Sequence, residues 1–297
     1  MTESAGQTPG TALTLPTHPL RIATAQAQAV AGDIEANVVT VAAMIREAAA
    51  AGARLVVFPE KFLSGYEPEL IRADPRRHAV QPRDPRLAPV AAVCRETGTV
   101  AVVGAAFHEV GDLYVSALVI GADGEHVTRY DKQHLFPTET PIYRAGTAGR
   151  TLELDGWRLG LGICYDSGFP EHARAAALDG CHAYVVGALF SVGNGYQESR
   201  TWFPARAREN TCYTVLSNHI GTTGGWHTCG SSAVWGPDGR ALAEAGPDRR
   251  ELVVVDLDPE VLRAARKAAP TPGDDTDGTG STGSTGDTAV RPAEPSP

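Results

Sequence analysis

The sequence is short of positive charge. It holds 26 Lys and Arg against 35 Asp and Glu, a formal net charge of -9, and the segment 271–297 alone carries five acidic side chains against one arginine. Binding to nucleic acid or to an anionic membrane calls for a basic patch, because phosphate groups must be neutralised. The charge balance therefore gives no case for either partner and favours small-molecule chemistry.

Cysteines and long apolar runs are also scarce. The five cysteines are an odd number in 297 residues and show no paired spacing, which argues against a disulfide framework. No uninterrupted apolar stretch approaches the about 18 residues of a membrane span, and residues 1–20 lack the basic and apolar regions of a signal peptide. We therefore expect a soluble, cytoplasmic protein that does not bind membranes.

The two ends of the chain differ in composition from the rest. Residues 271–297 consist mainly of Gly, Ser, Thr, Asp and Pro, with Val290 as the only large aliphatic residue, and residues 1–18 are similar but less extreme. Such segments bury too little apolar area to offset chain entropy. We expect a disordered extension at 1–18 and a disordered tail at 268–297, on either side of one domain at 19–267.

Between the ends, short β-rich runs alternate with helical patterns. Residues 20–25 and 54–58 are predicted strands. Between them, apolar residues recur at helical spacing from 38 to 49, and Gly52 stands where a C-cap glycine belongs. A second helix over 87–97 leads into a strand at 100–103. These patterns predict βαβ units, in which helices join parallel strands.

Hairpins are the second kind of pattern. Two are expected within 114–130 and 151–163, and a closing hairpin is expected to pair 232–235 with 252–257 through a turn at 237–239. Further predicted helices and strands are 171–178, 183–186, 198–210 and 212–217. A mixture of βαβ units and hairpins predicts a layered α/β domain with mixed sheets.

Three polar residues stand directly after apolar strands, where α/β enzymes keep their sites: Glu60, Lys132 and Cys164. Cys164 also begins a turn that leads into a helix. A thiol near pKa 8.5 is only a few per cent thiolate at neutral pH, so it needs a base to attack a carbonyl. Glu60 fits that base. Lys132, with the backbone N–H of Tyr165, fits the stabilisation of an oxyanion.

These residues lie in motifs that resemble the nitrilase superfamily of carbon-nitrogen hydrolases. The matching segments run in family order from about residue 21 to residue 257. They are 58–60 (Phe-Pro-Glu) with 62–66, 130–136, 162–166 with 169–171, 206–210, 230–232 and 236–239. Three spaced motifs, one around each of the three polar residues, are far more specific than any one of them alone.

The resemblance implies a four-layer αββα sandwich of the α/β class and a catalytic triad of Glu60, Lys132 and Cys164. It also implies a second glutamate that supports the triad, which Glu139 matches, and no metal or organic cofactor. Family members pair through their helical layers, so a homodimer or a higher homo-oligomer is implied as well.

The Cys-Tyr-Asp sequence at 164–166 resembles amidases and carbamoylases, whereas nitrilases more often carry Cys-Trp-Glu. The resemblance therefore favours a small-molecule amide as substrate, hydrolysed to a carboxylic acid and ammonia through a thioester. Hydrolysis of an N-carbamoyl compound or of a nitrile is the alternative. Tyr66, Tyr165 and Phe190 are the expected substrate-binding residues, although the segment 187–191 around Phe190 departs from the common family version.

Other chemistries fit the sequence less well. A papain-like enzyme could use His219 or His227, but the Cys-Gly-x-Cys-Trp context is absent. The segment 230–232 (Gly-Ser-Ser) lacks the glycine-rich surroundings of serine amidases. A zinc site from these two histidines with Cys212 and Cys229 has no close-pair ligand spacing. A non-enzymatic scaffold of the same fold is the remaining alternative.

Overall fold

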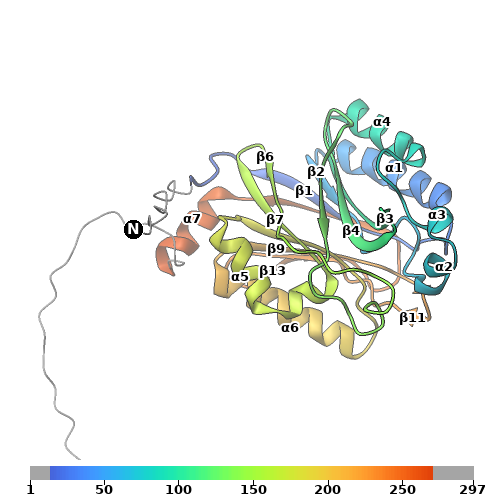
Figure 1. Ribbon diagram of the computed structural model, residues 1–297. Helices are drawn as coiled ribbons and strands as arrows, with labels where there is room; N and C mark the ends of the chain where they lie inside the picture. Colours follow the sequence, from blue (N-terminus) through green and yellow to red (C-terminus); the bar gives the residue numbers. More distant parts are fainter. Residues whose placement is uncertain (1–13, 270–297) are drawn as a thin grey trace, which may run out of the picture.

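The computed structural model describes residues 14–269 and has four layers, with two β-sheets packed face to face between two layers of helices (Figure 1). This arrangement confirms the predicted αββα sandwich. Residues 1–13 and 270–297, which make up most of the predicted extension and tail, lie outside the described residues. Residues 14–18 are described and already belong to the packed chain. Leu15 packs against the core between the sheets, and the His18 carbonyl accepts a hydrogen bond from Trp157 Nε1 (2.8 Å).

The first sheet has six strands in the order β14-β1-β2-β3-β4-β5. The strands β1, β2 and β3 run parallel to one another. The outer strands β14, β4 and β5 pair antiparallel with their neighbours. The strands are β1 (Leu20–Gln26), β2 (Leu55–Val57), β3 (Val100–Glu109), β4 (Asp112–Ile120), β5 (His126–Asp131) and β14 (Glu251–Leu257).

The second sheet repeats this pairing pattern, with a parallel trio β7-β8-β9 between antiparallel outer strands in the order β13-β12-β9-β8-β7-β6. Its strands are β6 (Thr151–Leu154), β7 (Trp157–Ile163), β8 (Ala183–Ala188), β9 (Tyr213–Asn218), β12 (Ala233–Trp235) and β13 (Ala241–Glu244). A separate pair, β10 (Thr222–Thr223) and β11 (Trp226–His227), lies outside both sheets. The molecule thus consists of two pseudo-equivalent halves.

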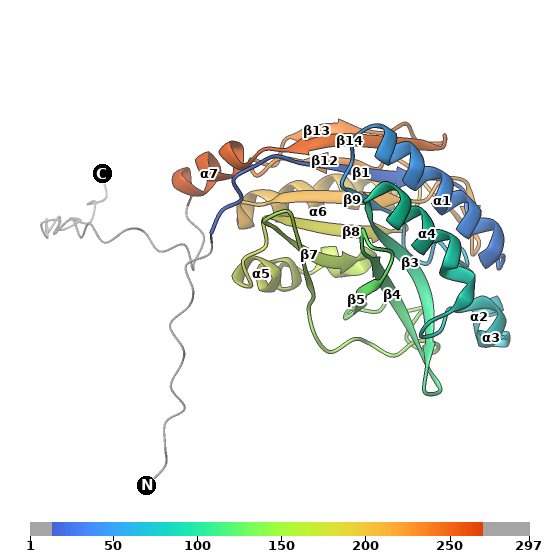
Figure 2. The ribbon, with the colours of Figure 1, turned by 90° about the horizontal axis from the view of Figure 1, so that it is seen from above.

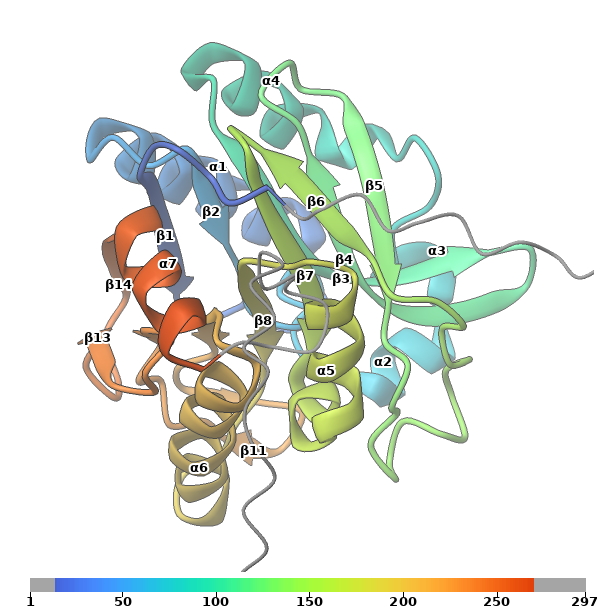
Figure 3. The ribbon, with the colours of Figure 1, turned by 90° about the vertical axis from the view of Figure 1, so that its left-hand side faces the viewer.

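Helices cover the outer faces of both sheets (Figures 2 and 3). The first sheet is covered by α1 (Ile34–Ala50) and α4 (Ala88–Thr97), and the second by α5 (Pro170–Leu178) and α6 (Asn194–Asn210). The remaining helices are α2 (Pro68–Ala73), α3 (Pro75–His78), the 3-10 helices η1 (Pro85–Leu87) and η2 (Cys164–Gly168), and α7 (Pro259–Ala268). None of the helices within 14–269 is long and apolar enough to cross a membrane.

The core follows from the alternation of side chains along the strands. In β7, Leu159 and Leu161 point into the core between the two sheets. Gly160 and Gly162, which alternate with these leucines, face the helical layer, where there is no room for a side chain. A Cβ on Gly160 would lie 2.8 Å from the Ala176 side chain, and a Cβ on Gly162 would lie 2.3 Å from the Tyr184 hydroxyl. The Leu-Gly-Leu-Gly pattern therefore brings this strand close to the helical layer.

The predicted closing hairpin is wrong. The turn at 237–239 joins β12 to β13, and β14 crosses to the other sheet, where it pairs antiparallel with β1 along seven residues. In β13, none of the four side chains is buried, so this strand lacks the apolar alternation that marks β14. The sequence pattern therefore favours β14 over β13 as the partner of β12, although β13 is the observed one.

Candidate active site

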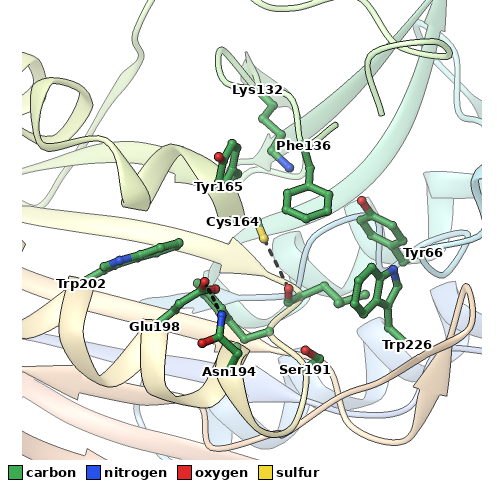
Figure 4. A pocket seen from close by; sticks show the side chains of 13 residues that line it. Tyr66, Lys132, Phe136, Cys164, Tyr165, Ser191, Asn194, Glu198, Trp202 and Trp226 are labelled. Carbon is green, nitrogen blue, oxygen red and sulfur yellow. Dashed lines mark hydrogen bonds between the residues drawn. The ribbon is translucent and has the colours of Figure 1, made fainter. Parts of the chain in front are cut away.

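Cys164 lies at the turn from β7 into η2, as predicted, and its φ of 44° is in the left-handed region that favours glycine. Keeping a non-glycine residue there costs on the order of 1–3 kcal/mol and is typical of functional turns. The thiol is partly exposed and points toward the carbonyl oxygen of Leu189, at 3.4 Å (Figure 4). Tyr165 is next in η2, and the first N–H groups of a helix have no partner within the helix.

The Asp166 carboxylate holds this turn against the loop after β5. Its Oδ2 accepts hydrogen bonds from the N–H of Ile163 (3.0 Å) and the hydroxyl of Tyr130 (2.7 Å), and its Oδ1 accepts from the N–H of His134 (2.9 Å). The His134 ring, which also contacts Oδ1, stacks on Phe169. Asp166 is fully buried, so it orders the turn and does not line the pocket.

Glu60 follows β2, and the segment 58–60 passes between Gly104 of β3 and Gly187 of β8 in the facing sheet. A Cβ on Gly104 would lie 1.9 Å from the Pro59 carbonyl oxygen, and a Cβ on Gly187 would lie 2.5 Å from that of Phe58. The backbone carbonyl of Glu60 accepts a hydrogen bond from His219 Nε2 (2.6 Å). Because burial lowers the pKa of His219 to about 4, its ring is neutral near neutral pH. His219 therefore supports Glu60 and is not a partner of Cys164.

Lys132 follows β5 and joins two carboxylates. Its Nζ donates hydrogen bonds to Glu60 Oε1 and to Glu139 Oε2, both at 2.7 Å, and all three side chains are buried. Burial alone would lower the pKa of Lys132, but the attraction of the two carboxylates raises it well above its usual range. The predicted triad residues and Glu139 are thus brought together around a permanently charged amine.

Glu139 is the centre of a second set of contacts. Its Oε1 accepts hydrogen bonds from Lys61 Nζ (3.0 Å) and the hydroxyl of Tyr66 (2.9 Å), and its Oε2 accepts from the N–H of Phe136 (2.9 Å). Burial opposes its charge, but Lys132 and Lys61 hold the pKa of Glu139 below its usual range. Our sequence reasoning missed Lys61, whose one available signal is its position next to Glu60.

Glu60 keeps one oxygen free. Its Oε2 is buried and has no hydrogen-bond partner among the described residues, which is rare for a buried polar atom. Burial raises the pKa of Glu60 against the opposing effect of Lys132. Burial and the nearby Glu60 charge also raise the pKa of the Cys164 thiol. The arrangement combines a protonated thiol with a carboxylate oxygen that is free to accept a proton.

The thiol opens into a pocket of about 230 Å³ that Lys132 also lines. All three predicted substrate-binding residues, Tyr66, Tyr165 and Phe190, line it as well. Our sequence reasoning assigned no site role to the other lining residues, among them Phe136, Asn194, Glu198, Trp202 and Trp226. They lie in loops or on α6, outside the strand-end pattern that marked the triad.

The residues of the rejected zinc site do not gather around a metal. Cys229 accepts a hydrogen bond from Asn218, His219 binds the Glu60 carbonyl, and His227 is exposed on β11. Within residues 14–269, no group of three or more His, Cys, Asp and Glu side chains is placed to hold a metal ion.

Comparisons with known proteins agree with the geometry. The family model described as carbon-nitrogen hydrolase matches residues 21–267. The chain is 34% identical to an (R)-stereoselective amidase from Pseudomonas sp, with 72% of this chain and 76% of that protein covered. It is 30% identical to an omega-amidase from Homo sapiens, with 79% of this chain and 87% of that protein covered.

A solved structure is also similar. It is a variant of the amidase from Nesterenkonia sp. AN1 in complex with butyramide, at 30% sequence identity and a TM-score of 0.74, with 84% of this chain and 95% of that one covered. In another variant of that amidase, the acetamide moiety of fluoroacetamide is attached covalently at the active site cysteine. These matches confirm the resemblance inferred from the motifs. The chain belongs to the carbon-nitrogen hydrolase family, within the amidase-like branch of the nitrilase superfamily.

Proposed function

We propose that the protein hydrolyses small amides to a carboxylic acid and ammonia through a thioester on Cys164. The observation that carries the proposal is the buried pairing of Lys132 with both Glu60 and Glu139 beside the pocket that holds the thiol. The pocket, at about 230 Å³, is smaller than the roughly 300–1,000 Å³ typical of sites for drug-sized ligands. A short substrate fits it.

Acylation uses the thiol proton and the free oxygen of Glu60. Cys164 Sγ attacks the amide carbon while Glu60 takes the thiol proton, and the electron pair of the carbonyl moves onto its oxygen. Lys132 Nζ and the N–H of Tyr165 stabilise this oxyanion. Glu60 then gives the proton to the amide nitrogen, the carbon-nitrogen bond breaks, and ammonia leaves a thioester behind.

Deacylation reuses the same base. Glu60 takes a proton from water, the hydroxide oxygen attacks the thioester carbon, and the carbon-sulfur bond breaks. The proton on Glu60 returns to the Cys164 sulfur, so each cycle restores the starting protonation. The thiol requires this assistance because its pKa is raised, which leaves almost none of it as thiolate at neutral pH.

The other side chains keep these groups in place. Glu139 fixes Lys132 and is itself held by Lys61 and Tyr66. Separating such buried charges from water has a large free-energy cost. A scaffold without activity gains nothing from burying charged side chains at this free-energy cost. The four buried charges therefore support an enzyme. The homo-oligomer, the cytoplasmic location and the lack of a cofactor expected from the sequence stay predictions.

The proposal is tested by ammonia release from a panel of short aliphatic amides, N-carbamoyl compounds and nitriles. We expect the amides to react best. Cys164→Ala should lower kcat/KM on the order of 10⁴-fold or more, as loss of a nucleophile does in other enzymes. Cys94→Ala, which removes another buried thiol in α4, is the matched control and should keep its activity.

The position of the nucleophile is tested by trapping. Protein mixed with substrate and quenched in acid should carry an acyl group on the peptide that contains Cys164, detected by mass spectrometry. An adduct on Cys212 or Cys229, or equal ammonia release by Cys164→Ala, would contradict the mechanism. Ammonia release from nitriles alone would show that the protein is a nitrilase and not the proposed amidase.

A further inference from the structure

The pocket has a second polar end that the proposed mechanism does not use. Asn194 and Glu198 project into it from the first turns of α6, and Trp202 follows one turn later on the same helix. In Figure 4, Lys132 approaches Cys164 from one side, and Glu198 and Asn194 lie on the other. A substrate carbonyl at Cys164 would therefore face Lys132, and the remainder of the substrate would extend toward Glu198.

The charges at this end are not balanced. Lys132 and Glu198 are the charged residues among those that line the pocket, and Lys132 already pairs with two carboxylates. No ion pair within residues 14–269 includes Glu198. Its Oε1 accepts a hydrogen bond from Asn194 Nδ2 (2.7 Å), a neutral donor that orients the carboxylate without neutralising it. Glu198 thus places a negative charge in the pocket.

Aromatic rings surround the same space. Trp202, Trp226 and Tyr165 line the pocket, and none of the three is fully buried. Faces of Trp and Tyr attract cations through the ring quadrupole, most strongly where water is displaced. A carboxylate together with aromatic walls is the combination that recognises an ammonium group. A carboxylate-bearing substrate would meet like charge at Glu198.

We propose that the substrates are short primary amides that carry an ammonium group, with Glu198 as the residue that binds this group. The inference rests on the proposed function, because it assigns the substrate class of the same pocket. Glu198 acts here on specificity and takes no part in the proton transfers at Cys164. Trp202, next to it on α6, provides a face for the cation.

The test compares amides of similar size that differ in terminal charge. They are 4-aminobutanamide, pentanamide, which replaces the ammonium by a methyl group, and succinamate, which ends in a carboxylate. We expect kcat/KM to be highest for 4-aminobutanamide and lowest for succinamate. Raising the ionic strength should reduce the preference for the cation, because salt screens partly exposed charges.

Glu198→Gln removes the charge and keeps the shape. It should lower the ratio of kcat/KM for 4-aminobutanamide over pentanamide by about 10- to 100-fold, the range expected for loss of a hydrogen bond to a charged group. The rate with pentanamide, which has no ammonium group for Glu198 to bind, should fall less than the rate with 4-aminobutanamide. Glu125→Gln is the matched control, since Glu125 is exposed in the turn after β4, and it should leave the ratio unchanged.

A binding measurement keeps this inference separate from the catalytic one. The Cys164→Ala protein cannot turn over, and calorimetry on it should show tighter binding of 4-aminobutanamide than of pentanamide. The same difference should disappear in the Cys164→Ala, Glu198→Gln double variant.

Two outcomes would overturn the assignment of Glu198. Wild-type protein could hydrolyse pentanamide as well as 4-aminobutanamide, or Glu198→Gln could slow both substrates equally. Either leaves the amidase proposal standing. If no amide reacts but the double variant still loses its preference in calorimetry, the cation site stands and the proposed hydrolysis fails.

Discussion

Burial raises the pKa of both groups proposed to exchange a proton, Glu60 and Cys164. The raised pKa makes Glu60 a better base than an exposed glutamate, and it keeps the thiol protonated until the carbonyl is in place. Lys132 opposes both shifts, because its charge favours the anionic form of each partner. The amine therefore limits how far burial raises the two pKa values.

The raised pKa of Glu60 predicts the acid side of the pH profile. Activity requires the ionised carboxylate, so kcat/KM should rise with pH through the Glu60 pKa, with a midpoint above the value of 4.5 for an ordinary glutamate. The measurement is kcat/KM between pH 4 and pH 8 with an uncharged amide, whose own charge does not change. A midpoint at or below 4.5 would show that Glu60 is not the base.

At the same scale, the sequence indicated the three residues of the proposed triad but not the residues around them. Glu60, Lys132 and Cys164 stand at strand ends, and a strand end is visible as an apolar run followed by a polar residue. Lys61 and Glu198 have no such signal. Lys61 follows a residue already assigned, and Glu198 belongs to a helix whose predicted start at residue 198 is four residues later than the observed Asn194.

At the scale of elements, Asp166 links the turn of Cys164, the proposed nucleophile, to the loop that carries Lys132. One buried carboxylate accepts hydrogen bonds from residue 163 before the nucleophile and from residues 130 and 134 on either side of the lysine. The Cys164 turn and the Lys132 loop come from different sheets, β7 and β5. Their relative position depends on this side chain.

Asp166→Asn should therefore lower kcat about 100-fold, because one oxygen becomes an NH₂ group that faces backbone N–H donors, and small displacements of catalytic groups have effects of that size. Stability should fall by about 1–3 kcal/mol. Asp131→Asn, next to Lys132 but paired with Arg129, makes the same chemical change outside the link. Urea unfolding and steady-state kinetics on both variants test the role, and equal kinetics would contradict it.

The elements found and missed by sequence reasoning differ in their apolar patterns. The parallel strands, α1 and α4 bury clear apolar faces, and all were predicted. The helix α5 was predicted as well, although it buries only His172 and Ala173. The short helices α2 and α3 bury one residue between them, which leaves no periodic pattern to read. The helix α7 was not predicted, although Asp258 and Pro259 form a helix-start signal at its N-terminus.

At the scale of the whole molecule, two buried histidines connect stability to pH. Burial lowers the pKa of His182 and of His219 to about 4, whereas an unfolded histidine has a pKa near 6.5. Between these values the unfolded chain binds a proton that the folded chain does not. The contribution of these two histidines to the free energy of unfolding is therefore fully present above pH 6.5 and decreases as the pH falls toward 4.

Each histidine should account for roughly 2 kcal/mol of the stability lost between pH 7 and pH 5. His182→Asn keeps an acceptor for the N–H of Arg158, which His182 Nδ1 binds at 3.0 Å, and it cannot be protonated. The difference in unfolding free energy between the two pH values should shrink in this variant. His227→Asn, at an exposed site, is the control, and an unchanged difference in His182→Asn would contradict the argument.

The pairing of β1 with β14 has a consequence for how the protein is made. Leu20 lies opposite Leu257, and the ion pair of Arg21 with Asp256 joins residues 235 positions apart. Until residue 257 has left the ribosome, β1 is an unprotected sheet edge next to β2, the strand that precedes Glu60. Nascent chains therefore cannot complete the first sheet before β14 has been made, and until then the edge of β1 is open to pairing with other chains.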